Sequence, residues 1–213
     1  MKKIVVVDYG SGNLRSVSKA LEAVAGANAS VAVSSDPAEV KAADRVVLPG
    51  QGAMGDCMRH LHESGLEEAV RFSLANKPVF AVCIGLQMLF DESDENSAKG
   101  LGIFRGRVIR FPEEAMRTAS GMRLKVPEMG WNRVTQAFPH PVWRGVENGA
   151  WFYLVHSYFA APEDTGIIAG ITSYGLPYTS AVAKDNIFAT QFHPEKSADD
   201  GLRLYANFID WNP

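Results

Sequence analysis

The chain has 213 residues, of which 46% are hydrophobic and 21% are charged, and its formal net charge is −3. This composition is that of a globular protein, and the charge gives no electrostatic support for binding to nucleic acid or to an anionic membrane. No apolar run reaches the ~18 residues that a membrane span requires, and the run after Met1 is too short for the core of a signal peptide. We therefore expect a cytoplasmic protein in which residues 1–213 form a single domain.

The first half of the chain alternates short β-branched runs with helical patterns. Apolar residues at helical spacing run from Leu14 to Val24, with Asn13 available as the N-cap and Gly26 as a stop. The other expected elements are strands at 4–7, 31–33, 45–48 and 79–82, and one or two helices over 54–75. Such alternation predicts a parallel sheet with helices on both faces, in which ligands lie beyond the carboxyl ends of the strands.

The second half is expected to consist mainly of strands joined by short turns. Strand-like segments lie at 104–111, 133–136, 151–155, 167–172, 180–184 and 187–191, and Asp185-Asn186 is typical of a hairpin turn. Residues 113–125 are interpreted as a loop or loose hairpin, and residues 197–210 as a closing helix. The sequence thus predicts an α/β fold whose parallel core is extended by antiparallel strands.

Cys83 is the candidate nucleophile. It ends the strand-like run, and Gly85 and a helical pattern follow it, which is typical of a strand, a sharp turn and a helix with the thiol at the turn. The helix dipole and the free backbone N–H groups of such a position favour thiolate over thiol. The alternative is a buried structural cysteine. Cys57 is the other of the two cysteines, and a disulfide between them is not expected in a reducing compartment.

His193 and Glu195 offer a base and an orienting acid two residues apart. They follow the strand-like run at 187–191, and extended backbone places side chains at i and i+2 on one side. Glu195 would then accept a hydrogen bond from one imidazole nitrogen while the other faces the thiol, as in an activated-nucleophile triad. A surface histidine and a solvated carboxylate are the alternatives. Together with Cys83, the pair predicts cleavage of an amide or ester through a covalent thioester.

Pro49-Gly50-Gln51-Gly52 is a glycine turn after a strand. On pattern alone it is a tight turn into a helix. As a functional element it predicts an oxyanion hole, because glycines on both sides let the peptide at Gln51 turn its N–H toward a developing oxyanion.

Two other patterns are weak. The run from Gly10 to Arg15 begins like a dinucleotide-binding fingerprint, but Arg15 stands at the third glycine position. Cys57, His60 and His62 have the chemistry of metal ligands, but on a surface helix the two histidines would point to different faces. We expect neither a metal nor a cofactor.

The chain resembles the class I glutamine amidotransferases and, within them, the glutaminase subunits of imidazole glycerol phosphate synthase from histidine biosynthesis. The first resemblance rests on residues 83–87, the nucleophile motif, and on His193-Pro194-Glu195. The second runs nearly end to end and rests on residues 8–13, 129–132, 156–158 and 193–197. It implies a three-layer, flavodoxin-like fold and hydrolysis of glutamine to glutamate and ammonia through a Cys83 thioester. It also implies a heterodimer with a (β/α)₈-barrel cyclase subunit, which receives the ammonia and makes imidazole glycerol phosphate and an aminoimidazole carboxamide ribotide.

The resemblance also assigns roles to individual residues. Cys83, His193 and Glu195 are catalytic, and backbone N–H groups at Gln51 and Gly52, with that of Ile84, or of Leu86 by register, bind the oxyanion. Substrate contacts are implied for Gln87, Glu95 and the backbone around Ser157 and Tyr158. Partner contacts are implied for Asn13, Trp131, Tyr153 and Lys196, which on residue type alone would be a cap, a core indole, a strand aromatic and a solvated lysine.

Three features depart from the family pattern. Gln51 stands where valine is expected, Glu128 stands where histidine is expected, and the segment at 113–125 is longer than usual. None of them touches the triad. Two other functions stay open at this point: a stand-alone cysteine hydrolase of γ-glutamyl substrates, and a regulatory module that has kept the fold and lost turnover.

Overall fold

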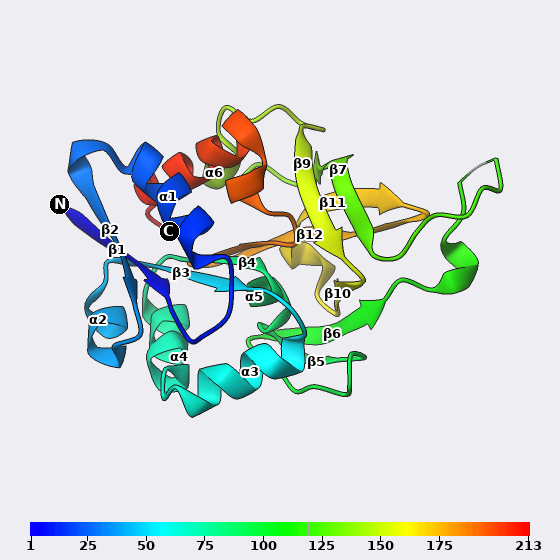
Figure 1. The fold of residues 1–213 in the computed structure, drawn as a ribbon. Helices are drawn as coiled ribbons and strands as arrows, with labels where there is room; N and C mark the ends of the chain where they lie inside the picture. Colours follow the sequence, from blue (N-terminus) through cyan, green and yellow to red (C-terminus); the bar gives the residue numbers. More distant parts are fainter. Residues whose placement is uncertain (119) are drawn as a thin grey trace.

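The computed structural model describes residues 1–118 and 120–213, and it shows one large mixed sheet between two layers of helices (Figure 1). The sheet has the strand order β2-β1-β3-β4-β13-β12-β10-β6-β5, with β11 joining β12 to β8, and β7 pairs with β9 in a separate two-stranded sheet. The strands are β1 (Lys2–Val7), β2 (Ala29–Ser34), β3 (Arg45–Gly50), β4 (Val79–Cys83), β5 (Phe90–Ser93), β6 (Phe104–Arg110), β7 (Glu128–Arg133), β8 (Thr135–Gln136), β9 (Trp151–His156), β10 (Tyr158–Pro162), β11 (Ile168–Tyr174), β12 (Leu176–Lys184) and β13 (Ile187–Thr190).

The strands β2, β1, β3, β4 and β13 are mutually parallel and form the core of the sheet. The apolar runs of β1, β3, β4 and β13 are buried because helices cover both faces, as expected for a parallel sheet, whereas the edge strand β2 is only partly buried. Helices α1 and α6 lie on one face and α2, α3 and α4 on the other (Figure 1). The helices are α1 (Leu14–Ala25), α2 (Pro37–Ala42), α3 (Met54–Glu63), α4 (Glu67–Asn76), α5 (Ile84–Gln87) and α6 (Ala198–Asp210). The sequence-predicted elements of the first half are confirmed, with two helices, α3 and α4, over 54–75.

The antiparallel extension is also confirmed, although its elements were predicted incompletely. β12 pairs antiparallel with β13, β11 and β10, and β10 pairs antiparallel with β6. The prediction missed β5, β7 and β10, and its single strand at 133–136 is in fact the end of β7 followed by the short β8. Of the segment expected as a loop or loose hairpin, the structure describes residues 113–118 and 120–125, which contain a 3-10 turn at Glu113–Ala115 and an antiparallel Arg117–Arg123 bridge. Among the described residues, the structure contains no helix long and apolar enough to cross a membrane.

The topology places the predicted functional segments at one edge of the sheet. β3 ends at Gly50 and β4 ends at Cys83, and these two residues are paired in register. The neighbouring strand β13 ends at Thr190, three residues before His193. The nucleophile, the glycine turn and the His–Glu segment therefore leave the carboxyl ends of three adjacent parallel strands, where such sheets bind ligands.

Candidate active site

Cys83 occupies a sharp turn between β4 and α5. Its backbone has φ 56° and ψ −109°, a conformation that non-glycine residues rarely adopt and that is typically held by the surrounding structure at functional sites. Gly85 is needed for this turn, because a Cβ there would collide with the carbonyl group of Leu48. The predicted helix after Cys83 is only the four-residue α5, so the dipole that acts on the thiol is that of a single turn.

His193 and Glu195 meet as predicted, but not through extended backbone. Residues Pro194–Lys196 form a 3-10 turn, since the fixed φ of Pro194 suits the start of a helical turn. Within this turn, His193 Nδ1 lies 2.9 Å from Glu195 Oε1, and the two side chains are only 5% and 1% exposed. The expectation of i, i+2 extended geometry was therefore wrong, although the predicted contact is present.

Two further side chains hold the Glu195 carboxylate. Asn13 Nδ2 donates to Oε1 at 3.4 Å, and the Tyr205 hydroxyl donates to Oε2 at 3.5 Å. Asn13 occupies the N-cap position of α1, but its side chain makes no capping hydrogen bond to the described residues. Burial, and then the charge of Glu195, raise the pKa of Tyr205, so this hydroxyl keeps its proton and remains a donor.

His193 is set up to carry a proton. Burial alone lowers its pKa, but the negative charge of Cys83 and the hydrogen bond and charge of Glu195 outweigh burial and raise the pKa to about 10. Its Nε2 is buried and meets no hydrogen-bond partner within the distance limits among the described residues. The ring thus presents Nε2 toward the site while Glu195 fixes Nδ1.

Gln191 belongs to the site, although sequence reasoning assigned it no role. It is fully buried, its Nε2 lies 3.7 Å from Cys83 Sγ, and its Oε1 accepts from Gln87 Nε2 at 3.1 Å. Gln87 also donates to the Tyr158 carbonyl at 3.1 Å, while its own Oε1 is buried with no partner among the described residues. The signal that could have identified Gln191 is its position two residues before His193, directly after the end of β13.

The glycine turn at residues 49–52 is held by two hydrogen bonds to its Gln51 carbonyl group. The Gln51 carbonyl accepts from Ser11 Oγ at 2.9 Å and from Cys57 Sγ at 3.3 Å. Gly52 follows with φ +94°, a conformation that favours glycine. Cys57, which the sequence offered as a weak metal ligand, is a buried donor to this turn.

A cavity of about 310 Å³ opens in front of Cys83. Most of the residues predicted to act on the oxyanion or the substrate line this cavity, and Leu86 is buried outside its lining. The lining includes Gln51, Gly52, Cys83, Ile84, Gln87, Glu95, His156, Ser157, Tyr158, His193 and Lys196. Glu95 reaches it from the loop after β5, with its carboxylate accepting from the Met54 N–H at 3.0 Å.

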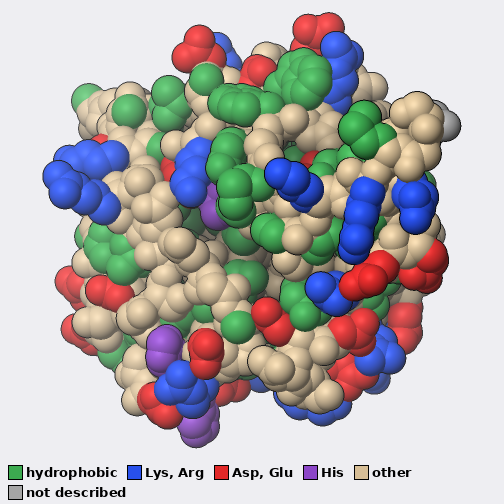
Figure 2. All heavy atoms as spheres, turned by 45° about the vertical axis from the view of Figure 1, so that its right-hand side comes forward, with side chains coloured by type: hydrophobic (Ala, Val, Ile, Leu, Met, Phe, Trp, Pro, Cys, Tyr) green, Lys and Arg blue, Asp and Glu red, His purple; other side chains and the backbone are tan. Residues whose placement is uncertain are grey.

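Three of the four predicted partner-contact residues lie together beside this cavity. Trp131 and Tyr153 are paired across β7 and β9, with ring centroids 6.3 Å apart, and Lys196 Nζ lies 5.5 Å from the Tyr153 ring. Trp131 is 49% exposed and Met129, on the same strand, is 66% exposed. The face that carries the antiparallel strands shows apolar side chains gathered in its upper half, with Lys and Arg side chains among them (Figure 2). Asn13 is the exception, since its side chain turns to Glu195.

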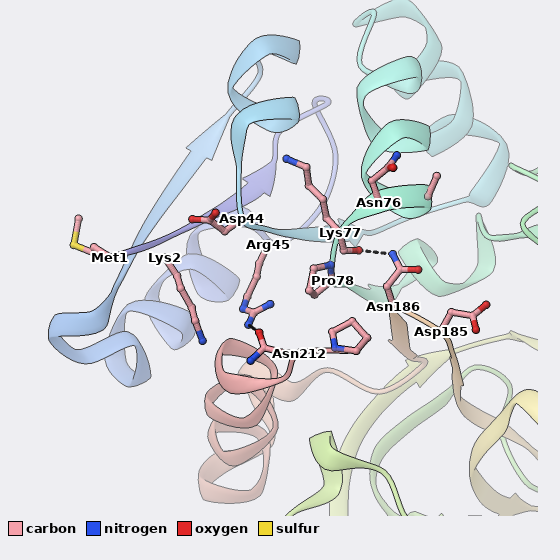
Figure 3. Close-up of a pocket in the computed structure, with 12 residues that line it drawn as sticks. Met1, Lys2, Asp44, Arg45, Asn76, Lys77, Pro78, Asp185, Asn186 and Asn212 are labelled. Atoms are coloured by element: carbon pink, nitrogen blue, oxygen red, sulfur yellow. Dashed lines mark hydrogen bonds between the residues drawn. The ribbon is translucent and has the colours of Figure 1, made fainter.

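A larger cavity of about 900 Å³ lies at the other end of the sheet, near the starts of β1, β3, β4 and β13 (Figure 3). Its cationic groups already have partners. Arg45 donates to the Ile209 carbonyl and to Asn212 Oδ1, and Lys77 donates to the carbonyls of Lys41 and Ala43. The Arg45 contacts tie the C-terminal segment to β3, and the Lys77 contacts tie the start of β4 to the end of α2, so we assign this cavity a structural role.

The chain is similar to known proteins over nearly its whole length. A family model described as glutamine amidotransferase class-I matches residues 5–211. The chain is 58% identical over 210 residues to the imidazole glycerol phosphate synthase subunit HisH of Dechloromonas aromatica. This alignment covers 99% of this chain and 97% of that protein. It is 57% identical over 213 residues to the protein of the same name from Aromatoleum aromaticum, covering 100% of both chains.

Solved structures with low sequence identity share the fold. A crystal structure of a glutamine amidotransferase superimposes with a TM-score of 0.69 at 19% identity, covering 97% of this chain and 99% of the other. The glutaminase domain of Trypanosoma brucei CTPS, solved with bound acivicin, gives a TM-score of 0.65 at 16% identity, covering 100% and 96%. The chain therefore belongs to the class I glutamine amidotransferase family, and within that family to the imidazole glycerol phosphate synthase subunits named HisH.

Proposed function

We propose that this chain hydrolyses glutamine as the glutaminase subunit of an imidazole glycerol phosphate synthase, with Cys83, His193 and Glu195 as its catalytic residues. The observation that carries the proposal is the convergence of the strained turn at Cys83 and the imidazole of His193, held by the Glu195 carboxylate, on one cavity. A cysteine and a histidine oriented by an acid are what thioester chemistry requires.

The first half of the reaction forms the thioester. Cys83 Sγ attacks the carbonyl carbon of the glutamine side-chain amide, and the carbonyl oxygen becomes an oxyanion. His193, which carries a proton because of its raised pKa, gives that proton from Nε2 to the amide nitrogen. The C–N bond breaks, ammonia leaves, and a glutamyl thioester remains on Cys83.

The second half returns the enzyme to its starting state. His193 takes a proton from water, the resulting hydroxide attacks the thioester carbonyl carbon, and glutamate leaves as the C–S bond breaks. Backbone N–H groups at Gln51 or Gly52, together with that of Ile84, would stabilise the oxyanion in both halves. Removal of one such donor in other enzymes slows turnover by about 10²- to 10³-fold.

Substrate positioning is assigned to the other residues that line the cavity. Gln87 Oε1, which has no partner in the part of the chain that the structure describes, is an acceptor suited to the α-ammonium group of glutamine, and the Glu95 carboxylate adds a negative charge to the lining of the same cavity. The backbone at Ser157 and Tyr158 would hold the α-carboxylate. An unpartnered buried acceptor costs free energy unless a ligand satisfies it, which supports a donor-bearing substrate at this position.

The proposed partner is a (β/α)₈-barrel cyclase subunit. Ammonia released into neutral water would be protonated and lost as a nucleophile, so it must pass directly into a second active site. The exposed Met129 and Trp131, with Tyr153 and Lys196 beside the cavity mouth, offer the apolar and cationic surface for docking. The relatives' name, a subunit of imidazole glycerol phosphate synthase, supports the existence of such a partner.

The test is glutamine hydrolysis by the chain alone, and then in the presence of both a cyclase subunit and its aminoimidazole nucleotide. We expect low activity in isolation and strong stimulation in the ternary mixture. High activity that is indifferent to the partner would instead show a stand-alone hydrolase of γ-glutamyl substrates. Binding to the cyclase without turnover under any condition would show a regulatory module.

A further inference from the structure

A buried polar cluster lies behind the active-site cavity, formed by Glu128 at the start of β7, His156 at the end of β9 and Tyr178 on β12. The side chains of His156 and Glu128 are only 2% and 3% exposed, and Tyr178 is 3% exposed. The proposed reaction uses none of these side chains. Burial of a carboxylate is unfavourable unless partners compensate its charge, so the cluster needs a physical account.

The hydrogen bonds of the cluster constrain which atoms can carry its protons. Glu128 Oε1 accepts from Asn132 Nδ2 at 2.8 Å, and Oε2 accepts from the Tyr178 hydroxyl at 2.8 Å. Tyr178 thus uses its only hydroxyl proton in the hydrogen bond to Glu128. Toward His156 Nε2, which lies 3.2 Å away, the Tyr178 oxygen can then only accept. His156 Nδ1 faces the Tyr158 carbonyl at 2.9 Å and must also donate.

This arrangement places both ring nitrogens of His156 to donate, beside the Glu128 carboxylate. His156 Nε2 lies 3.5 Å from Glu128 Oε2, close enough for charge compensation inside the protein. Burial, and then the charge of Glu128, raise the pKa of Tyr178, so the bridging hydroxyl stays protonated. The Phe111 ring packs 5.3 Å from the His156 ring and excludes water on that side.

The cluster reaches the active site through one carbonyl group. The Tyr158 carbonyl accepts both from His156 Nδ1 and from Gln87 Nε2, at 2.9 and 3.1 Å. Gln87 belongs to the nucleophile turn and contacts Gln191, which in turn contacts Cys83. The Tyr158 carbonyl therefore joins the buried charge pair to the substrate-binding backbone and to the nucleophile turn.

We propose that Glu128, Tyr178 and a doubly protonated His156 act as positioning residues, which fix the Tyr158 carbonyl and thereby the Ser157–Tyr158 backbone that would hold the α-carboxylate of glutamine. The inference rests on the function proposed above. Loosening the cluster should weaken substrate binding more than it slows the chemical step, because the triad residues have their own separate supports.

The kinetic test uses Tyr178→Phe in the complete complex with the cyclase subunit. The variant keeps the ring and removes the bridging hydroxyl, so we expect KM for glutamine to rise about tenfold, equivalent to about 1.4 kcal/mol, with kcat changed by less than about threefold. A merely structural role would lower the fraction of active enzyme, which reduces kcat and leaves KM unchanged. A wild-type KM in Tyr178→Phe would overturn the proposal.

Tyr174→Phe is the matched control. Tyr174 lies 5.9 Å from the same Phe111 ring and donates to the Lys125 carbonyl, but it has no hydrogen bond to Glu128 or His156 among the described residues. The same change there should leave KM for glutamine unchanged. A similar KM increase in both variants would show that general loosening of this aromatic cluster, rather than the Glu128–Tyr178–His156 contacts, is responsible, and would also overturn the proposal.

A spectroscopic measurement is independent of turnover. In ¹⁵N-labelled protein at neutral pH, long-range ¹H–¹⁵N correlations should show both ring nitrogens of His156 protonated, with the resonances assigned by their loss in His156→Gln. Glu128→Gln should convert this ring to a singly protonated form. A neutral His156 in the wild-type protein would overturn the cluster. Absence of glutaminase activity with an intact imidazolium signature would instead count against the proposed function alone.

Discussion

Gly201 offers the sharpest test of how helix α6 supports the His193–Glu195 turn. This buried glycine lies in the first turn of α6, against the carbonyl group of Pro194, which stands between His193 and Glu195, the two residues proposed as catalytic. A Cβ at position 201 would overlap the Pro194 carbonyl oxygen and lie 2.7 Å from its carbonyl carbon. Gly201→Ala should therefore displace the turn, even though alanine is the better helix former.

The size of the displacement sets the expected loss. The shortest contact is 1.9 Å, to the Pro194 carbonyl oxygen, and carbon and oxygen atoms pack at about 3.3 Å, so the helix and the turn must separate by about 1.4 Å. Misplacement of a catalytic group by about 1 Å can slow turnover by about 10²-fold. Overpacking costs about 1–3 kcal/mol, and the gain of about 1 kcal/mol in helix propensity offsets part of it, so the variant should still fold.

The assay is steady-state glutamine hydrolysis in the cyclase complex, with urea unfolding of the same preparations. We expect kcat to fall by about 10²-fold while the free energy of unfolding changes by about 2 kcal/mol or less. Gly55→Ala is the matched control on α3, because a Cβ there would meet only the Ala98 methyl group at 3.3 Å. Wild-type turnover in Gly201→Ala would refute the claim that α6 sets the position of the turn.

Three further predictions concern the triad and the glycine turn. Cys83→Ala should abolish glutamine-dependent synthesis but leave the cyclase reaction with added ammonia; loss of both would mean that Cys83 serves folding or assembly. The pKa of His193 is raised from 6.5 to about 10, so its stabilising contribution is fully present below pH 6.5 and is lost as pH rises toward 10. The difference in unfolding free energy between wild type and His193→Gln should shrink over that interval, and a constant difference in urea titrations would contradict it. Ser11→Ala removes one donor to the Gln51 carbonyl and should lower kcat by about 2- to 10-fold, whereas an unchanged kcat would show that this hydroxyl does not anchor the turn.

The parallel half of the fold was predictable because its strands are buried on both faces. Strands such as β1 and β4 appear in the sequence as uninterrupted apolar runs, since helices exclude water from both sides. β7 has no such pattern, because Glu128–Arg133 reads EMGWNR and contains charged, polar and glycine residues among its apolar ones. Its strand conformation depends on pairing with β9, which lies more than fifteen residues further along the chain. Long-range pairing of this kind leaves no local signal.

The candidate site was predictable to a similar extent. The side chains proposed to react stand in local motifs, a cysteine at a strand end and a histidine two residues before a glutamate, so their residue types and spacing were enough to select them. Supporting residues such as Gln191 and Gly201 carry no such signal. Gln191 acts through contacts with Cys83 and Gln87 in one distant segment, and Gly201 acts through the absence of a side chain. Both become visible only when the chain is folded.

The same distinction explains why Glu128 looked like a minor departure in the sequence. A carboxylate in place of an expected histidine reverses the local charge, and at a surface that change would be nearly neutral in free energy. Here the side chain is buried against His156, whose Nε2 lies 3.5 Å from Glu128 Oε2 and whose Nδ1 lies 2.9 Å from the Tyr158 carbonyl oxygen. A substitution on the exposed-looking strand that carries Trp131 thus alters a hydrogen bond at the back of the substrate cavity. Burial, which the sequence did not indicate at this position, is what gives Glu128 a role in positioning the substrate backbone.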